Sequence, residues 1–235
     1  MGNIRSTVGL CLVFITIVVS MFVLSVTREP QLSIEEMRSK GVFILPRPRD
    51  IAPFELIDHQ GRAFDNDRLK DKWSFVFFGF TNCPDVCPTS MSVLGQVERA
   101  LLANNPETSA QFQGVLVTVD PERDKAEALG AYATAFSPRF WGVTGGREAL
   151  AEVARQVNVA FAKVPLRDAQ GTPVPGTYTM DHTGNIVIIN PKGHYHGFIK
   201  LPHDAETNRC LLYTSPRPRD RQTYRLPSSA CKKKN

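Results

Sequence analysis

Two cysteines separated by three residues carry the strongest chemical signal in this sequence. Cys83 and Cys87 follow an apolar run that ends at Phe80, and a helical pattern begins at once behind them. If both entered that helix, their i, i+4 spacing would place the two sulfurs on one face, a turn apart. Two such thiols can form a disulfide or, as thiolates, hold a soft metal. We expect the unpaired N–H groups of the helix N-terminus to favour the thiolate form.

The elements that must position these cysteines follow from the hydrophobic pattern. Residues 73–80 form a nearly continuous apolar run, which is typical of a strand covered on both faces. Further strands are expected over 112–119, 140–143 and 195–199, helices over 89–102, 123–136 and 147–157, and hairpins over 54–64 and, around Gly184, over 178–190. This order predicts an α/β fold with helices on both faces of one sheet.

Other side chains with metal-binding chemistry have plainer explanations. His194 and His196 lie two residues apart, so on a strand they would face the same way and could form a second metal site. An exposed strand end explains them as well. Met91 and Met180 are soft donors, but core packing is their commoner use. Asp120, which precedes a proline where a strand is expected to end, can shape a site or simply form a turn.

The N-terminal region predicts a membrane anchor over residues 1–27. Residues 8–26 are uncharged and about as long as a bilayer-spanning helix, whereas a signal-peptide core is usually only about 7–15 residues. Arg5 precedes the span, and Glu35 and Glu36 follow it. This charge bias places the N-terminus in the cytoplasm and the domain outside. Residues 28–50 are interpreted as a polar tether.

The C-terminal segment explains the positive charge of the chain. The formal net charge is +5, and residues 210–235 contain seven Lys and Arg against one Asp, so the remainder is close to neutral. The folded part therefore offers no argument for nucleic-acid binding. The segment is rich in Pro, Ser and Arg without apolar periodicity, which predicts disorder. Its residues 210–222 are similar to a translated sequencing adaptor, which indicates a non-native tail. A solvated basic tail is the alternative, and we assign no role to Cys210 or Cys231.

Three motifs together resemble one known family. They are Cys-Pro-Asp-Val-Cys-Pro at 83–88, Val-Thr-Val-Asp-Pro-Glu-Arg-Asp at 117–124 and Tyr-Thr-Met-Asp-His-Thr at 178–183. On these the chain resembles the Sco/SenC family of copper chaperones over roughly residues 40 to 200. The resemblance implies a thioredoxin-like fold, with a central mixed sheet flanked by helices, for a domain placed at residues 51–209. The helix that usually closes the family's fold has no counterpart in this sequence.

The family resemblance also implies a set of ligands and a setting. By position, the copper ligands would be Cys83, Cys87 and His182, and the two cysteines would form the redox-active disulfide. Two thiolates and an imidazole are a mixed set that suits both Cu(I) and Cu(II). The implied protein is a membrane-anchored metallochaperone, not an enzyme, serving the copper centre of cytochrome c oxidase subunit II. A short N-terminus favours a bacterial inner membrane with the domain in the periplasm; the mitochondrial inner membrane is the alternative.

Three other functions remain open on the sequence. A thiol:disulfide oxidoreductase would keep a partner's cysteines reduced, although thioredoxin-type reductases normally have two residues, not three, between their cysteines. Val-Cys-Pro-Thr at 86–89 is similar to a peroxiredoxin active-site string, but Pro84 and Phe80 stand where that motif has Thr and Pro. A structural or redox-sensing module without metal affinity is the third.

Overall fold

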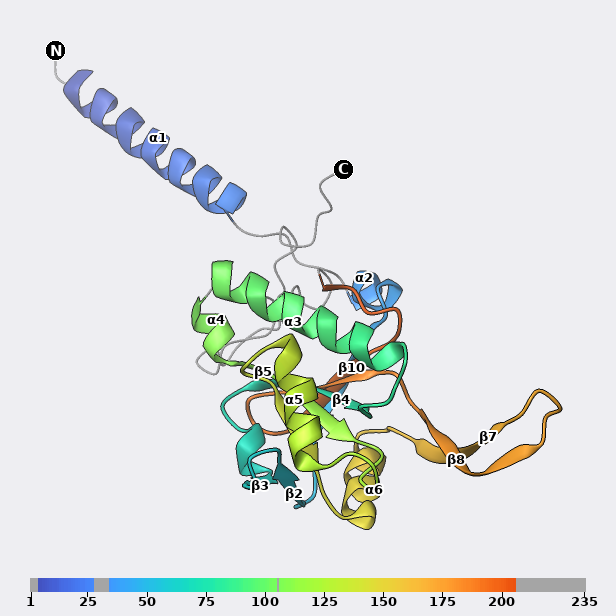
Figure 1. Cartoon of the computed structure of the whole chain (residues 1–235). Helices are drawn as coiled ribbons and strands as arrows, with labels where there is room; N and C mark the ends of the chain where they lie inside the picture. The colour runs from blue at the N-terminus through green and yellow to red at the C-terminus, as the bar shows by residue number, and fades with distance from the viewer. Residues whose placement is uncertain (1–3, 28–33, 105, 206–235) are drawn as a thin grey trace.

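The computed structural model describes residues 4–27, 34–104 and 106–205 (Figure 1). The tail expected over residues 210–235 lies outside the described residues. Most of the domain is built on an eight-stranded mixed sheet. In spatial order its strands are β1 (Val42–Arg49), β10 (Tyr195–Ile199), β9 (Ile186–Ile189), β4 (Trp73–Gly79), β5 (Phe112–Thr118), β6 (Trp141–Thr144), β2 (Glu55–Asp58) and β3 (Ala63–Asp65).

Strands β4, β5 and β6 form a parallel centre, and their other neighbours pair antiparallel. All seven residues of β4 and all seven of β5 are buried, as the continuous apolar runs predict. The predicted strands at 73–80, 112–119, 140–143 and 195–199 are thereby confirmed to within a few residues.

Helices cover both faces of this sheet, as predicted. Helix α3 (Val86–Asn104) and helix α5 (Ala126–Phe136) lie on one face, where Cys87 packs over Gly79 and Leu129 over Gly142. Helix α6 (Arg147–Gln156) covers the opposite face, where Val153 meets the alternate side chains of β4. The short helices are α2 (Ile34–Ser39), α4 (Pro106–Ala110) and the 3-10 turn η1 (Asp67–Leu69).

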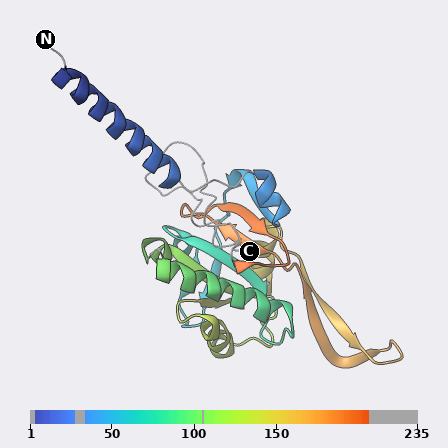
Figure 2. The same cartoon turned by 90° about the horizontal axis from the view of Figure 1, so that it is seen from above.

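A two-stranded ribbon stands apart from the main sheet. Strands β7 (Phe161–Arg167) and β8 (Pro173–His182) pair antiparallel with each other and project from the body (Figures 1 and 2). The predicted hairpin over 178–190 is therefore wrong. Its first half is the end of β8, and its second half is β9, which lies between β10 and β4. All four residues of β9 are buried, so this segment gains more by entering the sheet centre than by pairing with the exposed β8.

The segment interpreted as a tether is structured over most of its length. Residues 42–49 form edge strand β1, which pairs with β10, and Val42 is buried in the core. Pro46 and Pro48 favoured a linker in the sequence, but proline is compatible with an edge strand, where one side needs no ladder partner.

The N-terminal residues form helix α1 (Ile4–Thr27). The expected membrane-spanning helix is not found: in the described part of the chain, no helix combines the length and the apolar character needed to cross a bilayer. The helix itself forms where the sequence predicts one.

Burial of His196 makes the stability of the fold depend on pH. The side chain is 6% exposed, packs edge-on against Trp73, and burial lowers its pKa from 6.5 to about 4. Between these values the unfolded chain binds a proton that the folded protein does not, so the free energy of unfolding falls as the pH drops from 6.5 to 4.

We expect His196→Phe to remove about 3 kcal/mol of this pH dependence between pH 6.5 and 4, while the aromatic contact with Trp73 is kept. Urea unfolding curves of both proteins across this range provide the measurement. Parallel pH profiles for the two proteins would contradict the assignment.

Candidate metal centre

The two cysteines lie at the junction between β4 and α3. Strand β4 ends at Gly79, and α3 begins at Val86, so Cys83 lies in the connecting loop and only Cys87 is in the helix. The Cys87 N–H donates to the Cys83 Sγ at 3.4 Å. This sulfur therefore accepts one of the N–H groups that the first turn of a helix leaves unpaired. The sulfurs share one side of the junction, although Cys83 is not helical.

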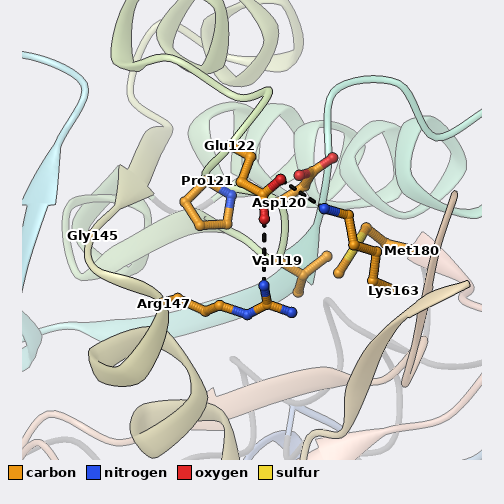
Figure 3. A pocket seen from close by; sticks show the side chains of 8 residues that line it. All are labelled: Val119, Asp120, Pro121, Glu122, Gly145, Arg147, Lys163 and Met180. Atoms are coloured by element: carbon orange, nitrogen blue, oxygen red, sulfur yellow. Dashed lines mark hydrogen bonds and ion pairs between the residues drawn. The ribbon is translucent and has the colours of Figure 1, made fainter. Parts of the chain in front are cut away.

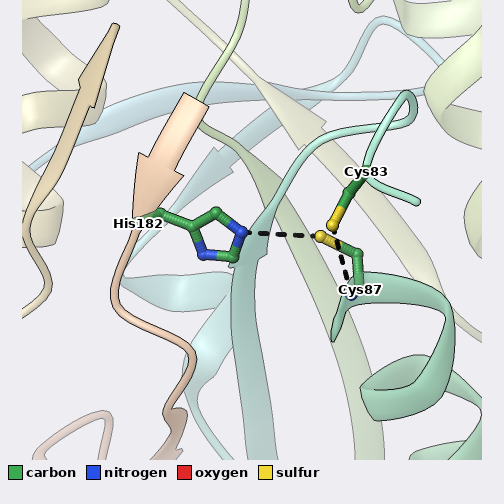
Figure 4. A group of neighbouring side chains, drawn as sticks. All are labelled: Cys83, Cys87 and His182. Atoms are coloured by element: carbon green, nitrogen blue, oxygen red, sulfur yellow. Dashed lines mark hydrogen bonds between the residues drawn. The ribbon is translucent and has the colours of Figure 1, made fainter. Parts of the chain in front are cut away.

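His182 reaches the cysteines from a distant part of the sequence. It is the last residue of β8, and its Nε2 lies 3.6 Å from the Cys87 Sγ (Figure 4). The donor atoms of Cys83, Cys87 and His182 all lie within 4.8 Å of one another. Among the described residues, these three form the only cluster of three or more side chains from Cys, His, Asp and Glu with that spacing.

The local contacts of His182 prepare one nitrogen for binding. Its Nδ1 lies 3.3 Å from the carbonyl oxygen of Thr183, and because a carbonyl oxygen only accepts, Nδ1 must carry the proton. The lone pair is then on Nε2, which faces Cys87. Burial lowers the pKa of His182, so the ring stays neutral to lower pH. The rings of Phe77 and Phe80 each contact the imidazole edge-on at 5.8 Å.

The state of Cys87 differs from the prediction that the helix N-terminus would favour its thiolate form. Cys87 is fully buried, and this burial, followed by its hydrogen bond with Cys83, raises its pKa well above the ordinary value. The loss of hydration therefore outweighs the helix N-terminus. Cys83 is half-buried, and both cysteines are free thiols in this structure.

The donor set fits a soft metal ion. Metal bonds to sulfur and to imidazole nitrogen are about 2.3 and 2.0 Å long, so two such ligands on a tetrahedral ion lie about 3.5 Å apart. The separation of 3.6 Å between the Cys87 Sγ and the His182 Nε2 matches this value. Two sulfurs and one imidazole suit copper and leave further coordination positions open.

The other candidate donors are not brought together. His194 precedes β10 and pairs with Asp50 at the surface, whereas His196 is in the core against Trp73. The second metal site considered for these histidines therefore does not form. Met91, on α3, is fully buried, in keeping with a packing role.

Beside β8 lies a pocket with a volume of about 270 Å³, lined by both charged and apolar residues (Figure 3). At its mouth, Glu122 pairs with Arg147 at 3.3 Å and with Lys163 at 2.7 Å. Met180 is 7% exposed and lines this pocket. Asp181, the neighbour of the candidate ligand, is exposed, and its charge only offsets part of the fall in the pKa of His182.

Sequence reasoning missed several polar residues that support the centre. Asp124 bonds to Thr81 in the cysteine loop, and Arg123 bonds to Tyr178 on the histidine strand. The signal was present in the motif at 117–124, where two aspartates follow the end of a buried strand. The Tyr132 hydroxyl is also buried without a hydrogen-bond partner among the described residues, and burial raises its pKa.

Comparison with known proteins decides the family. A family model described as SCO1/SenC matches residues 46–209. The chain belongs to the SCO1/SenC family. It is 37% identical over 162 residues to a Stutzerimonas stutzeri protein named "Putative copper-binding protein", covering 69% of this chain and 74% of that one.

Two further SCO1/SenC comparisons are with a longer relative and with a solved structure. The human mitochondrial SCO2 homolog is 35% identical over 153 residues, which cover 65% of this chain but only 54% of that protein. The copper-bound structure of Bradyrhizobium japonicum ScoI superimposes with a TM-score of 0.59 at 33% identity, covering 69% of this chain and 97% of the other. The mixed sheet flanked by helices is thus the thioredoxin-like Sco fold.

Proposed function

We propose that this chain is a metallochaperone that binds one copper ion through Cys83, Cys87 and His182. The observation that carries the proposal is the convergence of two free thiols and a neutral imidazole within 4.8 Å. The names of the Stutzerimonas relative and of the ScoI structure, both of which refer to copper, support the choice of metal. Copper is the cargo in this proposal, and the centre of cytochrome c oxidase subunit II is the proposed recipient.

The geometry suits a cargo that must leave again. Three protein ligands leave at least one position open, through which a ligand of the recipient can enter before a ligand of the donor departs. Cys83 and His182 are only partly buried, so an incoming ligand can approach from their side. The buried Cys87 is the ligand least accessible to exchange.

Binding depends on the redox state of the cysteines. Closing the Cys83–Cys87 disulfide removes two protons and two electrons from the dithiol and leaves no thiolate to hold copper. Because burial raises the pKa of the Cys87 thiol, this group is protonated before binding, and loading a metal releases its proton.

A thiol:disulfide oxidoreductase is the second candidate. One observation favours it: Cys83 is half-buried whereas Cys87 is fully buried, which gives an accessible thiol in the loop and a protected thiol in the first turn of α3. An accessible thiolate would attack the disulfide of a partner, and the protected cysteine would then release the mixed disulfide. His182 has no necessary part in this exchange.

The setting is proposed as a bacterial inner membrane that holds the chain through its N-terminal region, with the domain in the periplasm; the mitochondrial inner membrane is the alternative. The support is the uncharged stretch of residues 8–26 and the exposed apolar side chains within it, among them Leu10, Phe14 and Phe22. Carbonate extraction of membranes from expressing cells tests this: retention of the full chain supports the anchor, and release into the supernatant contradicts it.

The copper proposal predicts a specific loss in His182→Ala. In an anaerobic titration of the reduced chain, we expect the wild type to bind one copper per protein and the Cu(II) form to show a sulfur-to-copper charge-transfer band. Removing one of three ligands should weaken binding by at least about tenfold and abolish or shift the band.

His194→Ala, which removes a partly exposed histidine outside the centre, is the matched control and should bind as the wild type does. If the folded, reduced wild type binds no copper, the metallochaperone proposal fails. Reduction of a model disulfide by wild type and His182→Ala at equal rates would then favour the oxidoreductase.

A further inference from the structure

A buried carboxylate holds the cysteine loop in place. Asp124 is 2% exposed and accepts a hydrogen bond from the backbone N–H of Thr81 at 3.1 Å and another from the Thr81 hydroxyl. It also accepts a bond from the Thr118 hydroxyl at 2.7 Å. Thr81 lies two residues before Cys83, and Thr118 ends β5. Charge-assisted bonds of this kind are stronger than neutral ones, so they fix the loop to the end of the sheet.

A second carboxylate in the same turn holds the histidine strand. Asp120 is 3% exposed and accepts a bond from the Tyr178 hydroxyl at 3.0 Å and an ion pair from Arg123. Arg123 in turn donates to the Tyr178 carbonyl oxygen at 3.1 Å and stacks over the Tyr178 ring at 3.9 Å. Tyr178 and His182 are four residues apart on β8 and therefore share one face of the strand.

The two carboxylates are joined within one short turn. The backbone N–H of Asp124 donates to the carbonyl oxygen of Asp120 at 2.9 Å, and the N–H of Asp120 donates to the Thr118 hydroxyl at 2.9 Å. A displacement of this turn therefore moves the contacts to both halves of the candidate centre.

Such a connection matters because the ribbon of β7 and β8 has no strand pairing with the eight-stranded sheet in the described residues. The sheet alone does not fix the distance from His182 to the cysteines. Side-chain contacts at the base of the ribbon must do so, and those of Tyr178 with Asp120 and Arg123 lie on the same face of β8 as the imidazole.

We propose that the turn of residues 118–124, here called the clamp, positions the cysteine loop and the histidine strand relative to each other. Asp124 with Thr81 forms its cysteine arm, and Asp120 and Arg123 with Tyr178 form its histidine arm. These are positioning residues, because none of them is placed among the copper ligands. The inference rests on the proposed copper function for its histidine arm, whereas its cysteine arm can be tested without copper.

The histidine arm is tested with Tyr178→Phe, which removes the hydroxyl and keeps the ring under Arg123. We expect copper binding to weaken about tenfold, as when an outer-shell partner of a metal ligand is lost. The charge-transfer band should shift, and the ring resonances of His182 in the metal-free protein should move in NMR spectra. The equilibrium of the Cys83–Cys87 disulfide with a glutathione buffer should stay as in the wild type. Tyr195→Phe, on β10, is the matched control.

The cysteine arm is tested with Asp124→Asn and, in case that variant does not fold, with Thr81→Val. Both weaken the bonds to the cysteine loop. We expect the thiol–disulfide equilibrium constant to change by at least about threefold and copper binding to weaken as well. Asp67→Asn, at an exposed ion pair with Lys70, is the matched control and should change neither property.

The two arms therefore give different signatures. The clamp would be overturned if Tyr178→Phe kept the wild-type copper spectra and His182 resonances and the folded cysteine-arm variants kept the wild-type disulfide equilibrium. A loss of thermal stability without any of these changes would do the same, because it would show a purely structural role. If the wild type binds no copper but Thr81→Val shifts the disulfide equilibrium, the copper function fails and the cysteine arm stands.

Discussion

The antiparallel pairing of β9 with β4 is the constraint on which the candidate centre depends. Strand β4 ends at Gly79, and the cysteine loop leaves from that end. Because β9 runs in the opposite direction, its first residue, Ile186, lies beside Phe77, close to the same end. His182 precedes Ile186 by only four residues, so the sheet brings it near the end from which the cysteine loop leaves, and the side-chain contacts at the base of the ribbon fix the remaining distance. The connection from β8 to β9 lies within residues 178–190, where the sequence wrongly predicted a hairpin.

Burial favours the uncharged forms of two candidate ligands, Cys87 and His182. A charged thiolate or imidazolium in this position would lose hydration without a partner, which is costly in a protein interior. The protein keeps the Cys87 thiol protonated and the His182 ring neutral, as the directions of their pKa shifts show. In the proposed function, copper would supply the positive charge that makes a buried thiolate favourable, so binding and deprotonation would be coupled. The nearby side chains of Asp120 and Asp124 accept hydrogen bonds, and Asp120 also pairs with Arg123.

Much of the fold was predictable because its signals are local. Continuous apolar runs gave β4 and β5, and helical periodicity gave α3, α5 and α6, each within a few residues of the observed bounds. Strand β1 was missed because its two prolines are typical of linkers and only its place at the sheet edge makes them acceptable. The ribbon of β7 and β8 was missed because its exposed residues lack the alternation of a half-buried strand.

For the candidate centre too, features with a local signal in the sequence were predictable and features that depend on tertiary packing were not. The spacing of the cysteines and the family motifs predicted three residues that the structure brings together. The state of Cys87 was not predictable, because the depth of its burial depends on how α3 packs over Gly79. Nor were the contacts of Asp124 with Thr81 or of Arg123 with Tyr178, which join segments 43 and 55 residues apart in the sequence. Such contacts depend on how the strands and helices are arranged in space, which cannot be worked out from local patterns in one sequence.

The most direct test of the account is X-ray absorption spectroscopy at the copper edge of the loaded, reduced protein. The account predicts a first shell with two sulfur scatterers and one imidazole nitrogen, and a loss of the imidazole signal in His182→Ala. A first shell of nitrogen and oxygen without sulfur, or an imidazole signal that survives in that variant, would contradict the assignment of the centre to Cys83, Cys87 and His182.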